Sequence, residues 1–169
     1  RAEGEEGRKY LSTRGLSAEI IREHRLGFAP AAWDSLVLFL QKKGIPPNLA
    51  ESLGLIIPRK SGTAPAGRPG HFDRFRRRVI FPILQEGGRI AGFGGRIVDE
   101  TPGSDGLPPP KYMNSPESAI YSKGQMFYGW MAAKGPIRET GTALIVEGYM
   151  DLLSLHQEGF RNVVASLGT

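Results

Sequence analysis

The last third of the chain contains the pattern that most restricts the fold: a strand, a helix and a second strand in close succession. An apolar run at 142–147 ends in Glu147, and the β-branched stretch 162–167 follows a helical segment, 149–158, that ends at Gly159. Two strands of one sheet joined in this way are parallel, with a right-handed crossover. Two parallel strands bury too little surface to form a complete sheet. The pattern therefore predicts a parallel βαβ unit, and we expect the sheet to continue in a longer protein.

The first part of the chain is predicted to be helical. Apolar periodicity and capping residues indicate four short helices, at 3–13, 18–25, 31–43 and 48–53. Ser17 is the expected N-cap of the second helix. On the third helix, helical spacing predicts a core-facing stripe made of Trp33, Leu36, Val37 and Leu40.

The middle of the chain changes to a β-type pattern. The runs 77–84 and 88–98 are joined by a glycine-bearing connection, which predicts a hairpin. Two further helices are predicted, one from Pro116 to Lys123 and one over 126–133. Three apolar residues around the second are expected in the core: Met126, Phe127 and Trp130. The predicted fold class is thus α+β, or mixed α/β, with helices and a β-hairpin before the βαβ unit.

Composition excludes several classes of protein. No apolar run approaches the roughly 18 residues that a membrane span requires, and the charged N-terminus lacks the apolar centre of a signal peptide. The chain has no cysteine, so it has neither disulfides nor thiolate zinc sites. The three histidines, at positions 24, 71 and 156, are too widely separated to indicate a metal cluster. We expect a cytoplasmic protein without a membrane partner and, because there is no initiator methionine, an excerpt of a longer chain.

Charge is distributed unevenly along the sequence. Residues 59–96 hold nine basic and two acidic side chains, whereas residues 97–169 hold five basic and eight acidic ones. This asymmetry indicates a polyanion-binding region in the middle and a cation-binding or helix-end role for the later acids. Two stretches rich in glycine and proline, 59–70 and 99–110, are predicted to be flexible loops.

Two acids stand where the first predicted strand of the βαβ unit passes into its helix. Glu147 ends the strand, Gly148 permits a tight exit, and Asp151 falls in the first helical turn. Ligands of open α/β sheets gather at the carboxyl ends of strands, and two carboxylates there can share a hard cation such as Mg²⁺. The alternative is structural, because the helix dipole favours acids in a first turn regardless of function.

Three arginines alternate just before the predicted hairpin, and the hairpin itself is rich in glycine. Arg74, Arg76 and Arg78 would project from one face of an extended segment and match phosphate oxygens; alternatively, they blunt a strand edge. Residues 92–96, Gly-Phe-Gly-Gly-Arg, lack the third glycine of a dinucleotide-binding loop, so a Rossmann site is rejected. Their glycines predict a bulge or a close backbone approach, and Arg96 adds positive charge.

A compact polar group precedes the helix predicted at Pro116. Lys111, Tyr112 and Asn114 offer a cation, an aromatic ring and an amide, which suit single-stranded nucleic acid, and Lys123 would extend this track. The alternative is that Tyr112 is buried and that Ser115 simply caps a helix.

Taken together, these segments resemble the catalytic core of bacterial DnaG-type DNA primases. The matching strings occur in the family's order from about residue 10 to the last residue: YLSTRGL, LGFAP, DRFRRRVIFPI, GFGGR, PKYMNSPES, MFYGW, VEGYMD and VVASLGT. The combination of K-Y-x-N-S-P with V-E-G-Y-x-D is specific, since other Toprim proteins, including topoisomerases and recombination proteins, share only the acidic motif. The chain departs from the family pattern in its two longer Pro/Gly-rich loops.

The resemblance implies a division of the chain and a set of site residues. Residues 1–140 would form the N-terminal subdomain of the core with its basic ridge, and 141–169 the start of the Toprim subdomain. Glu147 matches the catalytic metal-site glutamate and Asp151 its companion acid, both toward Mg²⁺ or Mn²⁺. Positions that hold template DNA or nucleotide phosphates are matched by Arg76, Arg78, Arg96, Lys111, Tyr112, Asn114 and Lys123.

The activity implied by the resemblance is the synthesis of short RNA primers on single-stranded DNA from ribonucleoside triphosphates. The family's later D-x-D motif is absent from the sequence, so further metal ligands are expected downstream and this segment alone is expected to be inactive. Zinc is expected only in a missing upstream module, and the replicative helicase only through a missing C-terminal domain. Two alternatives remain open, another Toprim enzyme (a topoisomerase or nuclease) and a non-catalytic module that binds single-stranded DNA.

Overall fold

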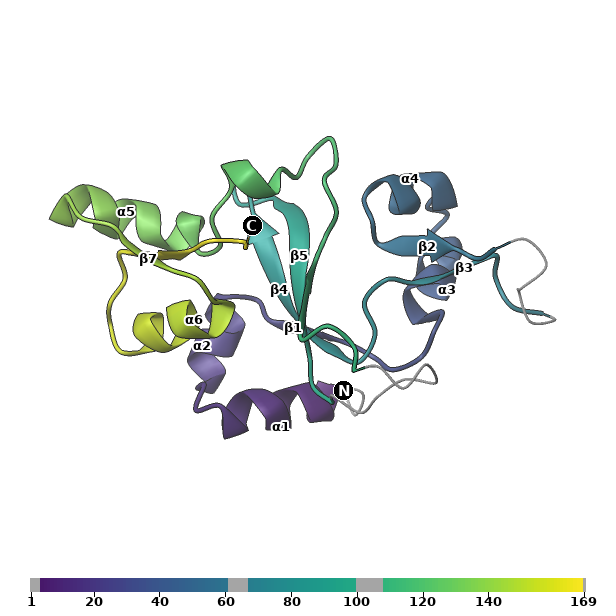
Figure 1. Cartoon of the computed structure of the whole chain (residues 1–169), viewed down its shortest axis with the longest axis horizontal. Helices are drawn as coiled ribbons and strands as arrows, with labels where there is room; N and C mark the ends of the chain where they lie inside the picture. The colour runs from purple at the N-terminus through teal and green to yellow at the C-terminus, as the bar shows by residue number, and fades with distance from the viewer. Residues whose placement is uncertain (1–3, 61–66, 100–107, 169) are drawn as a thin grey trace.

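An antiparallel sheet of four strands occupies the centre of the molecule (Figure 1). The computed structural model describes residues 4–60, 67–99 and 108–168. In the order β1–β4–β5–β6, the strands of this sheet are Gly27–Ala29, Arg78–Leu84, Ile90–Ile97 and Tyr112–Asn114. The predicted hairpin is confirmed, since β4 and β5 are antiparallel neighbours. Gly87 and Gly88 close their connection with φ angles of 82° and 75°, a left-handed backbone that favours glycine.

Two N-terminal helices lie below the central sheet in Figure 1. They are α1 (Glu5–Thr13) and α2 (Ala18–Glu23). The predicted N-cap is confirmed, because the Ile20 amide donates to Oγ of Ser17 at 3.3 Å. Apolar side chains of both helices join the main core, which includes Leu11 of α1 and Phe81 of β4.

A small lobe stands apart from the body, to the right in Figure 1. It contains α3 (Ser35–Lys42), α4 (Pro47–Ser52), β2 (Ile56–Pro58) and β3 (His71–Asp73), and its two strands pair antiparallel. Its own core has three buried members, Val37, Ala50 and Ile56. The predicted stripe is wrong for Trp33, which precedes α3 and is 49% exposed. Half of the loop predicted at 59–70 and most of that predicted at 99–110 lie outside the described residues, as does the predicted helix start at residue 3.

The C-terminal part confirms the predicted βαβ unit. Strands β7 (Leu144–Val146) and β8 (Val163–Ala165) are parallel, and α6 (Tyr149–Gln157) connects them. Helix α5 (Trp130–Thr140) also packs on β8. Leu152 and Leu153 of α6 are fully buried in the same core cluster as the central sheet. The βαβ unit is therefore packed directly against the part of the chain that precedes it.

The segment between β6 and α5 differs from the prediction. No helix forms over 116–123; a bridge between Ser118 and Tyr121 closes a turn, and a 3₁₀ turn, η2 (Lys123–Gln125), follows. Ser115 does not cap a helix, because its Oγ accepts from the Phe93 amide at 3.0 Å. The second predicted helix starts later, at α5.

Two residues of this segment that were predicted to be core are partly exposed. Phe127 is 41% exposed and Trp130 is 39% exposed, whereas Met126 does pack against the main core. No helix within the described ranges is both long enough and apolar enough to cross a membrane.

Candidate nucleic-acid and metal interface

The turn that joins β7 to α6 presents two acidic side chains at the surface. Glu147 directly follows β7, and Asp151 lies in the first turn of α6, as predicted. A Cβ atom added to Gly148 would lie 2.7 Å from Oδ2 of Asp151, so this carboxylate folds back over the turn. Glu147 and Asp151 are both exposed. We call residues 147–151 the acidic turn; its position at the carboxyl end of a parallel strand is where α/β proteins bind ligands.

The acidic turn offers a cation part of a coordination shell. Carboxylate oxygens are the donors that Mg²⁺ and Mn²⁺ prefer, so Glu147 and Asp151 fit such an ion by type. Six ligands are usual for Mg²⁺, and two carboxylates leave most positions to water or to other groups. In the described part of the chain, no three His, Cys, Asp or Glu side chains are grouped to hold a metal ion. The turn therefore supplies two ligands of a site, not a whole one.

The residues leading into and forming β6 lie beside the βαβ unit. We call residues 110–114 the basic loop, after the exposed Lys111. The ring of Tyr112 is 43% exposed, and its centroid lies 6.0 Å from that of Tyr149 in the acidic turn. Nζ of Lys123 lies 3.7 Å from a Cβ placed on Gly168, just after β8. The structure thus brings Tyr112 and Lys123 to the carboxyl edge of β7 and β8.

Asn114 connects the basic loop to the acidic turn directly. Its Oδ1 accepts a hydrogen bond of 2.7 Å from the hydroxyl of Tyr149, and its Nδ2 donates one of 2.7 Å to the Leu167 carbonyl. Gly94, opposite Asn114 in β5, leaves room for this contact, since a Cβ there would lie 2.4 Å from the Tyr149 hydroxyl. The predicted close approach at the glycine-rich strand is confirmed.

Two of the predicted arginines are buried rather than presented to a ligand. Arg78 is 3% exposed and donates to the carbonyls of Gly95 at 3.1 Å, Lys111 at 3.3 Å and Pro110 at 2.9 Å. Desolvation lowers the pKa of Arg78 to about 10, and its arginine neighbours contribute. Arg96 is 6% exposed and lies between the rings of Tyr10 and Tyr112, which also pack against its positive charge.

The predicted alternation of arginines on one strand face is wrong. Strand β3 ends at Asp73 and β4 begins at Arg78, so the intervening residues are a connection. Arg77 has a φ of 51°, which breaks an extended course, and it pairs with Glu6 at 2.8 Å and Asp99 at 2.5 Å. Arg77 is therefore a surface charge engaged in two ion pairs.

The remaining two arginines lie beside the small lobe, away from the acidic turn. The Arg74 amide donates to the Leu55 carbonyl at 3.0 Å, and the buried Nε of Arg74 has no hydrogen-bond partner among the described residues. Desolvation lowers the pKa of both Arg74 and Arg76, and each remains charged at neutral pH. Arg76 stacks on Trp33, with 4.1 Å between its guanidinium carbon and the ring centroid.

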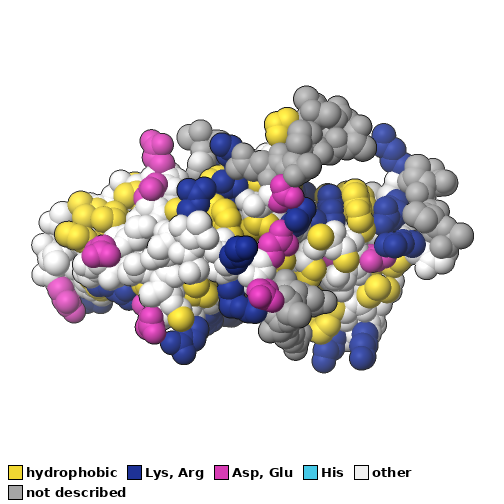
Figure 2. All heavy atoms as spheres, turned by 90° about the horizontal axis from the view of Figure 1, so that it is seen from below, with side chains coloured by type: hydrophobic (Ala, Val, Ile, Leu, Met, Phe, Trp, Pro, Cys, Tyr) yellow, Lys and Arg dark blue, Asp and Glu magenta, His cyan; other side chains and the backbone are white. Residues whose placement is uncertain are grey.

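Sequence reasoning missed this aromatic cluster on the lobe. The rings of Trp33 and Phe72 lie 5.5 Å apart, and Arg59 and Arg76 approach both of them. Figure 2 shows lysine and arginine side chains beside hydrophobic ones on this right-hand part of the molecule. The available signal was Phe72 with Arg76 four positions later, whereas Trp33 lies 26 positions before Arg59 and 43 before Arg76. An exposed ring flanked by guanidinium groups suits stacking of a nucleobase.

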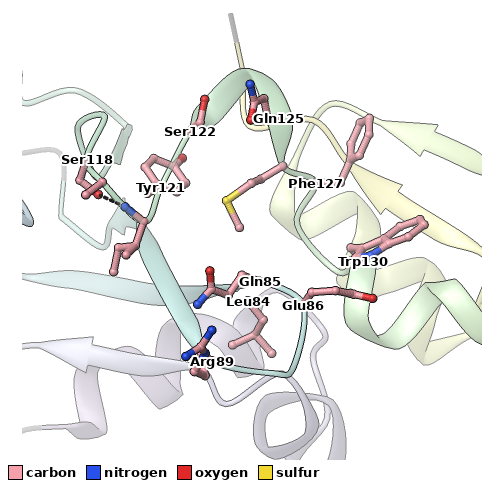
Figure 3. A pocket seen from close by; sticks show the side chains of 13 residues that line it. Leu84, Gln85, Glu86, Arg89, Ser118, Tyr121, Ser122, Gln125, Phe127 and Trp130 are labelled. Atoms are coloured by element: carbon pink, nitrogen blue, oxygen red, sulfur yellow. Dashed lines mark hydrogen bonds between the residues drawn. The ribbon is translucent and has the colours of Figure 1, made fainter.

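A separate groove lies between the β4–β5 connection and residues 118–130 (Figure 3). It has a volume of about 820 Å³. Phe127 and Trp130 stand on one side of it and Arg89 on another. None of the predicted site residues lines this groove.

The fold and the site together define a class of mixed α/β proteins. In this class an antiparallel sheet that contains buried arginines adjoins a parallel βαβ unit that presents two acidic side chains. Comparison with family models narrows this class. Residues 1–134 match the DNA primase catalytic core, N-terminal domain, and residues 141–169 match the Toprim domain. The chain therefore belongs to the DnaG-type DNA primase catalytic-core family, as its motifs predicted.

Two bacterial DNA primases are similar in sequence to nearly the whole chain. The DNA primase of Halalkalibacterium halodurans is 43% identical and covers 99% of this chain, while the chain covers 26% of that protein. The Escherichia coli DNA primase is 42% identical over 96% of the chain, again 26% of the relative. The chain thus spans about a quarter of the length of the relatives it matches.

Solved structures of the family share the fold. The RNA polymerase domain of Mycobacterium tuberculosis primase DnaG, in complex with a double-stranded DNA oligomer with a 6-nucleotide overhang, matches with a TM-score of 0.84 at 37% identity, over 99% of this chain and 48% of that one. A DnaG primase catalytic domain bound to single-stranded DNA matches with a TM-score of 0.81 at 39% identity, over 100% and 48%. The Escherichia coli primase catalytic core matches with a TM-score of 0.81 at 40% identity, over 100% and 50%.

Proposed function

We propose that this chain is the template- and nucleotide-holding part of a DNA-dependent RNA polymerase that makes short RNA primers on single-stranded DNA. The observation that carries the proposal is the contact between the two charged regions. Asn114 of the basic loop touches Tyr149, which lies between the two acids of the acidic turn. Cation-binding and phosphate-binding groups are thereby held at one edge of the molecule. Primase relatives with DNA bound in their solved structures support the choice of nucleic acid as the ligand.

The acidic turn takes the metal side of the reaction. Glu147 and Asp151 would hold Mg²⁺ or Mn²⁺, with other ligands supplied from outside the described residues. Bound there, the ion would supply charge neutralisation on the nucleotide phosphates during attack by a primer hydroxyl. The contribution of the chain is to keep both carboxylates at the solvent-exposed end of β7. With only two carboxylates, this segment alone would bind the ion weakly and would not polymerise.

The basic loop and the lobe take the nucleic-acid side. Lys111 offers an exposed charge to phosphate, and Tyr112 presents a half-exposed ring that Arg96 supports from below. Arg78 contributes indirectly, because its hydrogen bonds to the carbonyls of Lys111 and Pro110 fix the course of the loop. Trp33 and Arg76 extend the surface onto the lobe as a stacking platform.

Binding of single-stranded DNA by this chain tests the nucleic-acid assignment. The Lys111→Ala variant should bind a fluorescent oligonucleotide more weakly and lose about one unit of slope in a plot of log affinity against log salt. The matched control is Lys134→Ala, which removes a partly exposed lysine of α5 that pairs with Glu86. Equal affinities and slopes for the two variants would overturn the assignment of the basic loop.

The alternatives differ in the chemistry of the intact protein. A topoisomerase or nuclease would cleave DNA in the presence of Mg²⁺, whereas a pure binding module would neither cleave DNA nor synthesise primers. A primase would incorporate ribonucleotides on a single-stranded template, and Glu147→Gln would abolish that incorporation without loss of DNA binding. The isolated chain serves as the negative control, since appreciable primer synthesis by it would contradict the two-ligand site.

A further inference from the structure

Two polar side chains bridge the basic loop and the acidic turn, and we propose that Asn114 and Tyr149 are positioning residues that hold the acidic turn in its metal-binding orientation. This inference rests on the proposed function, in which Glu147 and Asp151 bind the ion. It also reassigns Asn114, which the sequence pattern placed among the groups that touch nucleic acid.

The bridge joins three segments that are far apart in the sequence. Tyr149 is the first residue of α6, Asn114 is the last residue of β6, and Leu167 follows β8. The hydroxyl of Tyr149 donates to Oδ1 of Asn114 at 2.7 Å, and Nδ2 of Asn114 donates to the Leu167 carbonyl at 2.7 Å. One amide therefore contacts the chain just after both parallel strands, on the edge where the acids lie.

The chemistry of the bridge permits one orientation of each group. A backbone carbonyl only accepts, so Leu167 fixes Nδ2 of Asn114 as the donor and leaves Oδ1 to accept. Because Oδ1 can only accept, the hydroxyl of Tyr149 is the donor in their 2.7 Å hydrogen bond. Both polar ends of the Asn114 side chain thus make a hydrogen bond within the protein, which fixes the orientation of its amide.

Packing against neighbouring rings directs the hydroxyl of Tyr149 toward Asn114. The ring stacks on Phe81 with centroids 4.7 Å apart and an interplanar angle of 14°, and it meets Tyr128 edge-on at 4.8 Å. Only a residue without a side chain fits at Gly94 beneath it, since a Cβ would lie 2.4 Å from the phenol oxygen. The ring is thus held on three sides, with its hydroxyl directed at Asn114. It anchors the backbone of the turn close to Glu147 and Asp151, each of which lies two positions away.

A variant that lacks only the Tyr149 hydroxyl loses the hydrogen bond to Asn114 but keeps the packing of the ring. Tyr149→Phe and Asn114→Ala should each speed hydrogen exchange of the Leu152 amide, which donates to the Gly148 carbonyl at 3.3 Å, about tenfold. Each should also weaken Mn²⁺ binding at the acidic turn roughly three- to tenfold. Mn²⁺ binding is measured by paramagnetic broadening of resonances in the acidic turn. The double variant should be no worse than Asn114→Ala alone, because Asn114→Ala already removes the hydrogen bond that Tyr149→Phe removes.

The matched control is Tyr128→Phe, which removes another hydroxyl from the same core. The Tyr128 hydroxyl is buried and has no hydrogen-bond partner among the described residues, so its loss should change neither exchange nor Mn²⁺ binding. Gly94→Ala should reproduce the effect of Tyr149→Phe by displacing the ring, whereas Gly27→Ala in β1, with its nearest neighbour at 3.8 Å, should not.

The results distinguish a failure of the proposed hydrogen-bonded bridge from a failure of the proposed metal-binding function. The bridge is overturned if Tyr149→Phe matches Tyr128→Phe in both exchange and Mn²⁺ binding, or if Asn114→Ala weakens DNA binding severalfold with Mn²⁺ binding intact. The metal assignment fails instead if Glu147→Gln leaves the Mn²⁺ broadening unchanged. In that case hydrogen exchange of the Leu152 amide still decides whether the bridge holds the turn.

Discussion

The body of the molecule and the small lobe are held together by different means. The main core cluster includes fifteen buried residues from the central sheet, α1, α2 and the βαβ unit, whereas the cluster of the lobe includes three. In the lobe the buried carboxylate of Asp73 accepts hydrogen bonds from the first amides of α3. In the body the aromatic rings pack on one another, as Tyr149 does on Phe81.

This difference suits the body and the lobe to different roles. The backbone of the acidic turn is joined to the body, where a large apolar core packs α6. The lobe leaves an aromatic ring and several arginines at its surface, and its smaller core predicts more frequent local opening. Under the proposed function, the acids would need fixed positions to bind a metal ion, whereas a surface that follows a flexible strand of nucleic acid would not. Three predictions test this contrast.

The largest effect is expected from the cap of the lobe. Asp73 is 3% exposed, and its carboxylate accepts from the Leu36 amide at 2.7 Å and the Val37 amide at 3.0 Å. Asp73→Ala leaves these amides without an acceptor and should destabilise the lobe by about 4 kcal/mol. Hydrogen exchange should show this loss in α3 and α4 and little change in α6.

The control for the cap lies directly before the same helix. Asp34 occupies the N-cap position of α3 but makes no capping hydrogen bond; it pairs instead with Arg68 at 3.0 Å. Asp34→Ala should therefore cost about 0.5 kcal/mol or less. If Asp73→Ala instead loosens α6 as much as α3, the lobe and the body unfold as one unit and the contrast between them is wrong.

The next effect concerns the body, which contains a buried pair of histidines. Nε2 of His156 lies 3.0 Å from the Val163 carbonyl and must carry the proton of that bond, so Nδ1 of His156 accepts from Nε2 of His24 at 3.1 Å. Burial lowers the pKa of His24 to about 4, with His156 adding to the effect. The Glu23–Arg161 ion pair and the ring of Tyr128 are the other groups that face the pair.

A histidine that is neutral when folded makes stability depend on pH. The unfolded chain takes up a proton near pH 6.5, so the stabilisation is complete above that pH and is lost as pH falls toward about 4, by up to about 3 kcal/mol. Urea unfolding at pH 7, 5.5 and 4.5 measures this loss. His24→Gln keeps a donor toward His156 but does not titrate, so its stability should fall less over the same range. Parallel curves for the variant and the parent chain would exclude His24 as the cause.

Local patterns predicted the parts of the fold whose causes lie close together in sequence. The βαβ unit, the hairpin and the Ser17 cap each depend on a few adjacent residues, and the acids took their predicted places because strand and helix bounds fix them. Arg78 was predicted to bind phosphate, because a strand pattern does not reveal which distant segment of the chain covers a side chain. The Lys111 segment, more than thirty positions later, returns to supply the carbonyls that bury it. The predicted helix at Pro116 failed for a similar reason, since Pro116 packs against Gly54 of the lobe, where a Cβ would lie 2.2 Å away.

The smallest expected effect concerns the exposed ring of the lobe, and here stability and binding should diverge. Trp33→Ala removes a ring that is 49% exposed, so folding should lose little, while binding of single-stranded DNA should weaken by about 1.5 kcal/mol, or roughly tenfold. The matched control is Trp130→Ala, which removes a ring that is 39% exposed on α5 beside the groove of Figure 3. Fluorescence anisotropy with an oligonucleotide measures both variants. A loss of affinity for Trp130→Ala with none for Trp33→Ala would place the DNA on the opposite side of the body and remove the lobe from the binding surface.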